Sequence, residues 1–200
     1  MTEAHPAPDR WEYRQFWPAG TDPMTALLQA LADGPVRGSE SAEWYLVLPS
    51  RLDLNIKWRA QRLDIKRLRA VDQDLQQWQA LGKWPFPLNS GAVHAISQLC
   101  GLTLVEADLA DWAALVKHLR DQGFAVSDVQ VKKQRQQWPA QSGWLEHCQL
   151  IIQDRQYQSI CLEHHCPDTL RRWLDKLAID ASSNRSYAQF LAEVVATAKR

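Results

Sequence analysis

Charged residues recur at every second position in one segment of this sequence. They stand at positions 57 and 59 and again, after Ala60-Gln61, at positions 62, 64 and 66. An extended strand places such residues on one face, and a two-residue turn at Ala60-Gln61 brings Lys57 opposite Asp64. Lys and Arg donate charge-assisted hydrogen bonds to phosphate groups. The segment therefore predicts a hairpin with a phosphate-binding face, made by Lys57, Arg59, Arg62 and Lys66, with Asp64 among them.

A second basic pair lies in the other half of the chain. Lys133 and Arg135 share one face of an expected strand over 126–138, and Lys132 points to the opposite face. One interpretation is that both basic faces are the solvated side of an antiparallel sheet. The other is that the strands curl until this side becomes an interior. Buried like charges then need counter-charges or a bound anion, and a phosphate-rich ligand would supply one.

Carboxylates near these positions are candidate metal ligands. Glu163, Asp64 and Glu12 could offset the basic charge or hold a divalent ion that bridges phosphate oxygens. A different cluster, Cys161 with His164, His165 and Cys166, has the residue types of a metal site, but its spacing matches no standard zinc motif. A turn at residues 155–156 would add His147 opposite His164. We favour reduced cysteines and surface histidines, because consecutive strand residues point to opposite faces. The sequence contains no P-loop, dinucleotide-binding or nucleophile-elbow motif.

The elements that position these residues follow from periodicity and turn signals. Thr21-Asp22-Pro23 predicts the start of a helix that ends near residue 32. Other expected helices cover 92–100, 109–122, 169–177 and 187–198, and expected strands cover 11–17, 43–48, 54–59, 62–66, 76–84, 126–138, 147–154 and 157–164. Many strands, few helices and antiparallel hairpins predict an α+β fold with a barrel or strongly curved sheet. We expect one domain over residues 1–180, with 181–200 as a linker and a helix that packs on it.

Composition narrows the classes of partner. The 200 residues carry a formal net charge of zero, whereas a nucleic-acid binder that relies on global charge is basic, so an anion site must come from local arrangement. No apolar run approaches the ~18 residues of a membrane span, and residues 1–10, with Pro6 and Pro8, do not resemble a signal peptide. We expect a cytoplasmic protein with no membrane partner. The four cysteines are expected to be reduced and mostly buried, and the ten tryptophans to pack in the core.

Three segments resemble the CYTH, or triphosphate tunnel, superfamily. They are Asn55 to Leu68 (NIKWRAQRLDIKRL), Val131 to Trp138 (VKKQRQQW) and Ser159 to His165 (SICLEHH). The resemblance covers the chain from Trp11 to about Leu177. It implies an antiparallel tunnel of eight strands, in which basic residues grip a triphosphate and acidic residues bind Mg²⁺ or Mn²⁺. By position, it assigns phosphate binding to Lys57, Arg59, Lys66, Lys133 and Arg135, and a metal ligand to Glu163.

The chain departs from the family pattern at the acidic positions. The family's first strand reads Glu-x-Glu-x-Lys, and the equivalent here is Glu12-Tyr13-Arg14-Gln15-Phe16. The late acidic pair is reduced to Cys161-Leu162-Glu163. Hydrolysis in this family uses metal to position water and neutralise developing charge, so the loss of carboxylates weakens the case for catalysis.

The sequence therefore leaves three functions to compare. The first is a tunnel that binds a polyphosphate or organic triphosphate, with hydrolysis assisted by Mg²⁺ or Mn²⁺. The second is a non-catalytic binding or adaptor protein that has kept the fold and lost the metal site. A weaker third is a binder of single-stranded nucleic acid that uses the basic face and nearby tryptophans.

Overall fold

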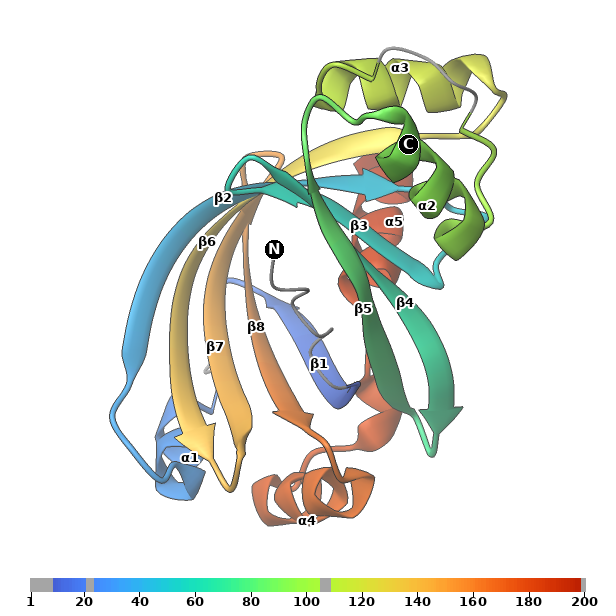
Figure 1. Cartoon of the computed structure of the whole chain (residues 1–200). Helices are drawn as coiled ribbons and strands as arrows, with labels where there is room; N and C mark the ends of the chain where they lie inside the picture. Colours follow the sequence, from blue (N-terminus) through green and yellow to red (C-terminus); the bar gives the residue numbers. More distant parts are fainter. Residues whose placement is uncertain (1–8, 21–23, 105–108, 199–200) are drawn as a thin grey trace.

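The strands close into a single antiparallel barrel. The computed structural model describes residues 9–20, 24–104 and 109–198. The strand order around the barrel is β1-β5-β4-β3-β2-β6-β7-β8 (Figure 1). The strands are β1 (Arg10–Pro18), β2 (Arg37–Val47), β3 (Leu54–Arg59), β4 (Arg62–Asp72), β5 (Leu75–Pro85), β6 (Ser127–Ala140), β7 (Gly143–Ile152) and β8 (Arg155–His164). The predicted α+β fold with an antiparallel barrel of about eight strands is confirmed.

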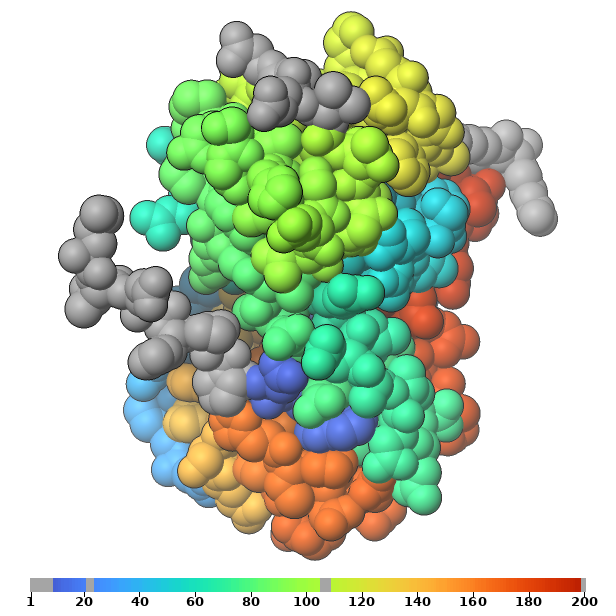
Figure 2. Space-filling model, turned by 45° about the vertical axis from the view of Figure 1, so that its right-hand side comes forward, coloured from blue at the N-terminus to red at the C-terminus, as the bar shows by residue number. Residues whose placement is uncertain are grey.

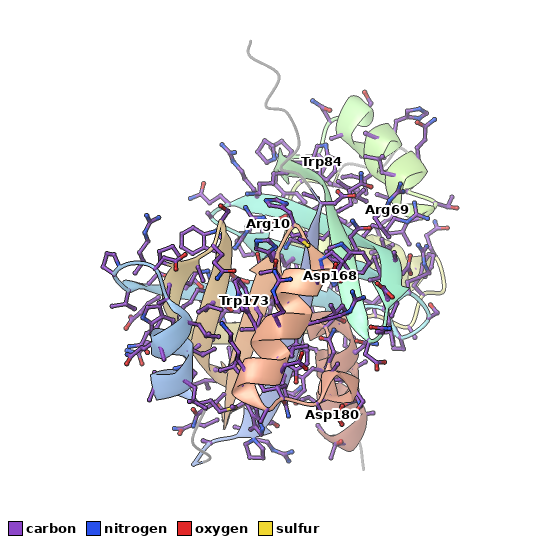
Figure 3. The ribbon with its side chains drawn as sticks, turned by 90° about the horizontal axis from the view of Figure 1, so that it is seen from below. Arg10, Arg69, Trp84, Asp168, Trp173 and Asp180 are labelled. Atoms are coloured by element: carbon purple, nitrogen blue, oxygen red, sulfur yellow. The ribbon has the colours of Figure 1, made fainter. Side chains whose placement is uncertain are left out.

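Helices pack against the barrel, most of them on its outer face. They are α1 (Thr25–Leu31), α2 (Ser90–Cys100), α3 (Trp112–Asp121), α4 (Pro167–Leu177), the short 3₁₀ helix η1 (Ala181–Ser183) and α5 (Tyr187–Ala198). In Figure 1, α2 and α3 lie over one end of the molecule and α4 lies at the other. Figure 3 views that second end from below, with Trp173 and Asp168 labelled on α4. No helix in the described part of the chain has the length and apolarity needed to cross a lipid bilayer.

Apolar residues on the outer face of the strands meet these helices. Leu46, Ile56 and Leu63 belong to one buried cluster that includes residues of α2 and α3. Ile160 and Leu162 belong to a second cluster with residues of α4. Because successive strand residues alternate in direction, the neighbours of these apolar residues point into the barrel. The two-residue period that organises the core therefore also fixes which charged residues lie inside.

The hairpins turn tightly without the residues that usually permit it. Residues 60–61, 73–74, 141–142 and 153–154 form the two-residue connections, and both residues of each pair have positive φ. Asn-Gly is the favoured sequence for such turns, and none of these pairs has it. In the first hairpin Lys57 lies opposite Asp64, as predicted.

The last helix, α5, packs on the inner side of the barrel. Its residues Tyr187, Leu191 and Val194 form a buried cluster with side chains of β2, β6 and β7, including Tyr45 and Val131. Tyr45 has the same strand parity as Glu43, and Val131 has the same parity as Lys133, so these apolar residues line the barrel interior. The helix therefore fills one end of the barrel, and the charged residues occupy the space next to it.

The seam between β1 and β5 is one of the two shortest in the barrel, and the other joins β2 and β3. It has three residue pairs, Arg10–Trp78, Trp11–Gln77 and Glu12–Gln76, whereas β1 pairs with β8 over eight. Figure 2 shows this face: the blue atoms of β1 emerge as small patches between the green atoms of β4 and β5 and the orange atoms of β8 and α4. The segment before α5 reinforces the seam, because the Asn184 side chain donates to the carbonyls of Glu12 and Asp74 and accepts from the Arg14 amide.

Three sequence-based boundaries need correction. Strand β2 begins at Arg37, not at residue 43, because its polar first half is held by pairing with β6 and carries no apolar alternation. Helix α3 begins at Trp112 behind an Asp111 cap, and Leu109 instead forms a bridge with Leu88. The second hairpin turns at residues 153–154, not 155–156. The helix start predicted at residues 21–23 lies outside the described residues.

Candidate functional site

The centre of the polar interior is a buried carboxylate, Glu43. Its side chain is 1% exposed. The oxygen Oε2 accepts a hydrogen bond from the Tyr45 hydroxyl at 2.9 Å and lies 2.9 Å from Lys133 Nζ and 3.7 Å from Lys57 Nζ. Strands β3 and β6 flank β2 on its two sides, so they deliver these two ammonium groups to one carboxylate.

Two arginines face the other oxygen of the same carboxylate. Oε1 of Glu43 lies 3.5 Å from Arg59 Nη1 and 3.6 Å from Arg135 Nη2. Each guanidinium has a second, closer partner: Arg59 lies 2.7 Å from Asp64, and Arg135 lies 3.0 Å from Glu146. Glu43 is therefore shared by four cations, two lysines on one oxygen and two arginines on the other.

The ion-pair network continues to β1 through Arg14. Its Nη1 lies 2.9 Å from Glu146 and its Nε 3.0 Å from Glu12, and both bonds are buried or nearly so. The guanidinium also lies over the Tyr187 ring, with its carbon 4.8 Å from the ring centroid. Lys133 Nζ lies 3.9 Å from the same ring centroid. Helix α5 thus supplies an aromatic wall to the charged region.

The charges in this network do not balance. The salt bridges connect five cations with four carboxylates, which are Arg14, Lys57, Arg59, Lys133 and Arg135 with Glu12, Glu43, Asp64 and Glu146. Burial on its own raises the pKa of Glu43, but Lys133 and Lys57 lower it by more, so this pKa lies far below its usual value. Burial, with Lys133 and Arg59, lowers the pKa of Lys57 to about 7 despite the attraction of Glu43. Burial also lowers the pKa of Lys133, so the two lysines are the cations that this network compensates least.

Solvent reaches this network from the arginine side. The Arg59 side chain is 33% exposed and that of Arg135 17%, whereas those of Lys57 and Lys133 are 10% and 2% exposed. An anion entering from solvent would meet the two guanidinium groups first. Their planar forks suit two-point contact with phosphate oxygens.

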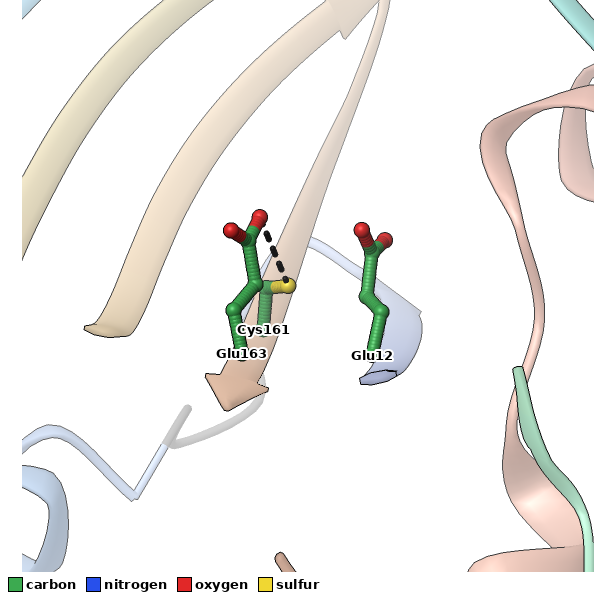
Figure 4. Close-up of side chains that lie close together, drawn as sticks. All are labelled: Glu12, Cys161 and Glu163. Atoms are coloured by element: carbon green, nitrogen blue, oxygen red, sulfur yellow. Dashed lines mark hydrogen bonds between the residues drawn. The ribbon is translucent and has the colours of Figure 1, made fainter. Parts of the chain in front are cut away.

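A second cluster joins two carboxylates and a thiol. Glu12 and Glu163 are directly paired across β1 and β8, and Cys161 lies two residues before Glu163 on the same face (Figure 4). One ligand atom from each of these three residues lies within 4.8 Å of the others. Cys161 Sγ donates to Glu163 Oε1 at 3.8 Å, the contact dashed in Figure 4.

This cluster does not fit Mg²⁺ or Mn²⁺ in the arrangement observed. Those ions prefer several oxygen ligands. Burial raises the pKa of Cys161 well above its usual value, so the third donor is a neutral thiol. Glu12 already binds Arg14 at 3.0 Å, and Glu163 binds Arg10 at 3.4 Å. Lys66 also carries its charge beside both acids: burial lowers its pKa, but Glu163 and Glu12 raise it by more. Cations therefore already satisfy the two carboxylates.

Comparisons with known proteins add structural matches but no sequence match. No protein-family model and no curated protein matches the sequence. HpAC1 from Hippeastrum, described as having a dominant triphosphatase activity, is 11% identical with a TM-score of 0.48, over 85% of this chain and 88% of that one. The PH1819 protein of Pyrococcus horikoshii OT3 is 13% identical with a TM-score of 0.45, over 92% and 98%. A conserved hypothetical protein from Pyrococcus furiosus has 13% identity and a TM-score of 0.45, over 88% and 98%.

All three TM-scores are below 0.5, so the fold assignment rests on the strand pairing of this chain. A closed ring of eight antiparallel strands with charged side chains inside is the architecture that the resemblance predicted. The chain thus has the closed eight-stranded barrel that the resemblance implied. Within this tunnel, the interior interpretation of the basic faces is the correct one, because Lys57, Asp64 and Lys133 are buried.

The tunnel brings together most of the predicted basic residues, but not all. Lys57, Arg59, Lys133 and Arg135 surround Glu43, and Lys66 lies beside the Glu12–Glu163 pair. Arg62 is exposed at the end of the first hairpin, outside this buried network. Asp64 is not part of the carboxylate pair, because it serves as the counter-ion of Arg59.

The predicted arrangement of histidines was wrong. His147 lies opposite Ile160 and not opposite His164, because the turn falls two residues earlier than expected. His147 contacts Gln158, and His164 contacts the carbonyls of Gln141 and Cys166. These rings have structural partners of their own. All four cysteines are free thiols, and Cys166 is the exposed one.

Sequence reasoning missed the counter-ions. Glu43 was placed at the start of a strand with no role, although it shares strand parity with Tyr45 on the inner face. Glu146 lay outside the expected strand 147–154 and so had no predicted direction. Arg14 was seen only as a departure from the family pattern, yet it joins Glu12 to Glu146. Alternation gave a signal for Glu43, but β2 is apolar on both faces, so which face lies inside could not be read from it.

Proposed function

We propose that this protein binds a triphosphate-containing or polyphosphate anion inside its CYTH-like tunnel. The observation that carries the proposal is the surplus of buried cations around Glu43. Four cationic side chains converge on one carboxylate, and burial, with repulsion from Lys133 and Arg59, lowers the pKa of Lys57 to about 7 despite the attraction of Glu43. An anion with several charges would supply the missing compensation.

The donor set suits phosphate in particular. Two guanidinium groups, two ammonium groups and the Tyr45 hydroxyl point to one region, and the arginines are on its solvent-accessible side. Phosphate oxygens accept several hydrogen bonds at once, and arginine forks match their geometry. Nucleic acid is a weaker candidate, since Trp44, Trp58 and Trp112 pack in the core cluster outside the barrel and do not form a stacking platform within it.

Hydrolysis with Mg²⁺ or Mn²⁺ is the second candidate. The direct pairing of Glu12 with Glu163 favours it, because carboxylate oxygens are among the ligands that such an ion prefers. In this arrangement Arg14 and Arg10 hold those carboxylates. We therefore expect binding without turnover.

Calorimetric titration with tripolyphosphate tests the binding proposal. The key variant is Lys57→Met, which removes the uncompensated charge while keeping the length of the side chain. Its matched control is Lys132→Met on the exposed, opposite face of β6. We expect the wild-type protein to bind and Lys57→Met to lose roughly tenfold or more in affinity, since a nearby unit charge in a partly buried site is worth more than a surface one. Absence of binding by the wild type, or equal losses in both variants, would overturn the proposal.

Phosphate release separates the two candidates. The substrates are tripolyphosphate and nucleoside triphosphates, with Mg²⁺ or Mn²⁺ added, and the variant is Glu163→Gln. No release above buffer agrees with a binding protein. Metal-dependent release that Glu163→Gln abolishes would instead establish the triphosphatase.

A further inference from the structure

Glu43 is held in the way a protein holds a bound anion. Lys57, Lys133, Arg59 and Arg135 all lie within 3.7 Å of its two oxygens, and the Tyr45 hydroxyl donates to it at 2.9 Å. In the described part of the chain, no other carboxylate has as many cationic partners. A phosphate group placed in this region would use the same donors.

We propose that Glu43 is an internal competitor of the ligand, and that it sets the minimum charge of the anion that the tunnel admits. This inference rests on the proposed function. The carboxylate occupies the position of one phosphate group, so a ligand gains these cations only as it displaces Glu43 from them. Glu43 is thus a residue that determines specificity, as well as a structural counter-ion.

The choice between anions follows from comparing the charge of each anion with that of Glu43. Glu43 carries one negative charge and is already in place, so it loses no translational freedom when it binds the cations. A free anion with a single phosphate group has a similar charge and must lose that freedom, so its exchange for Glu43 is unfavourable. An anion with several linked phosphates brings more charge to the same cations and also reaches further groups. The tunnel therefore discriminates against inorganic phosphate and in favour of condensed phosphates.

The geometry offers an exit for the displaced carboxylate. Ser41 stands two residues earlier on the same face of β2, and its hydroxyl lies 3.5 Å from Glu43 Oε1. Ser41 is only partly buried, and the strand becomes exposed toward residue 37. A rotation of the Glu43 side chain toward Ser41 moves the carboxylate along β2 toward the more exposed part of the strand and away from Lys57. Ser41 lies beside the same oxygen as Arg59 and Arg135, so the displaced carboxylate stays near the arginines and leaves Lys57 to the ligand.

Replacement of the carboxylate by an amide tests this inference. Glu43→Gln keeps the shape and the hydrogen bond with Tyr45 but removes the charge. Its control is Glu40→Gln, on the exposed face of the same strand. The probes are inorganic phosphate and tripolyphosphate, each titrated into wild type and both variants. We expect Glu43→Gln to bind tripolyphosphate roughly tenfold more tightly than wild type, to gain more than this for inorganic phosphate, and Glu40→Gln to match wild type.

The two hypotheses fail in different ways. Wild type that binds no tripolyphosphate overturns the proposed function, but a tight Glu43→Gln complex in the same experiment supports the competitor. If wild type binds tripolyphosphate and Glu43→Gln binds it with equal or lower affinity, the proposal that Glu43 competes with the ligand is overturned and the proposed function is not. If Glu43→Gln does not fold because its cations repel, the comparison is made between Lys57→Met and Lys57→Met/Glu43→Gln, in which one charge of each sign is gone. No gain in affinity between those two variants overturns the inference.

Discussion

Lys57 is the lysine whose pKa the charged interior lowers to about 7. It lies between Glu43, which attracts it, and Lys133 and Arg59, which repel it, while Asp64 faces it across the hairpin. Its ammonium also lies 5.9 Å from the centroid of the Tyr45 ring. Burial outweighs the attraction, and the pKa falls from 10.5 to about 7. The folded protein therefore holds fewer protons at this site than the unfolded chain between these two values.

This titration predicts a pH dependence of anion binding. Below pH 7, Lys57 is charged and ready to bind; above it, the free protein has a neutral Lys57 that must take up a proton before it can pair with an anion. Tripolyphosphate affinity should fall as pH rises from 7 to 9, by up to about tenfold per pH unit from this group. Titrations at several pH values, in buffers with different ionisation enthalpies, measure both the fall and the proton uptake.

The control for this pH dependence is Lys57→Met. This variant has no lysine to titrate at position 57, so its affinity should lack the fall with pH that Lys57 causes. Titration of the ligand itself affects both proteins equally and cancels in the comparison. Parallel pH profiles of the two proteins would contradict the assignment to Lys57. The same shift has a consequence for stability without ligand: the unfolded state binds more protons between pH 7 and 10.5, so the contribution of Lys57 to folding stability rises with pH across that interval.

Among the elements, the segment that leads into α5 reinforces one of the two shortest seams of the barrel. Strands β1 and β5 share only three residue pairs, and Asn184 adds two donors and one acceptor across the same gap. Just beyond it, the Gln189 side chain of α5 accepts from Gln76 of β5. The C-terminal region thus holds the barrel closed in addition to filling one end of it.

Loss of the Asn184 side chain should therefore cost more than loss of an ordinary asparagine. Asn184→Ala removes one buried and two partly buried hydrogen bonds to the backbone, and we expect the free energy of unfolding to fall by about 2 kcal/mol. Asn89→Ala is the comparison, because that side chain makes one capping bond to the Ala92 amide of α2 and its loss costs about 1 kcal/mol. Urea unfolding measures both variants. Similar losses would show that Asn184 does not reinforce the seam.

The sequence predicted elements where a periodic pattern and a sharp boundary coincided. In the first hairpin the break in alternation at Ala60-Gln61 marked the boundary, although the turn lacks favoured residues, and the predicted register was correct. The range of α5 was also correct, but its place inside the barrel was not predicted, since periodicity shows that a helix has an apolar face and does not show which surface that face meets. The polar half of β2 was missed because its strand structure depends on hydrogen bonds to β6.

The sequence indicated the basic residues of the candidate site but not their acidic partners. The basic residues could be found from the sequence because they alternate on strands. The counter-ions could not, because the pairing of Glu43 with cations from β3 and β6 exists only when the barrel closes. The sequence thus predicted a basic interior, whereas the folded interior is an ion-pair network in which cations slightly outnumber carboxylates.

For the whole molecule, closure turns two charged sheet faces into one enclosed region. The eight strands turn two apolar clusters outward, under α2, α3 and α4. They turn the charged residues inward, beside a third apolar cluster that packs on α5. Carboxylates, and not solvent, compensate most of that interior charge. The central claim is that the remaining positive charge is where a condensed phosphate binds.

A crystal structure of the protein with tripolyphosphate tests that claim most directly. We predict density for the anion inside the tunnel, in contact with the guanidinium groups of Arg59 and Arg135, with the Glu43 side chain turned away from Lys57. An anion bound on the outer face of the barrel, beside Lys132, with the Glu43 network unchanged, would contradict the account.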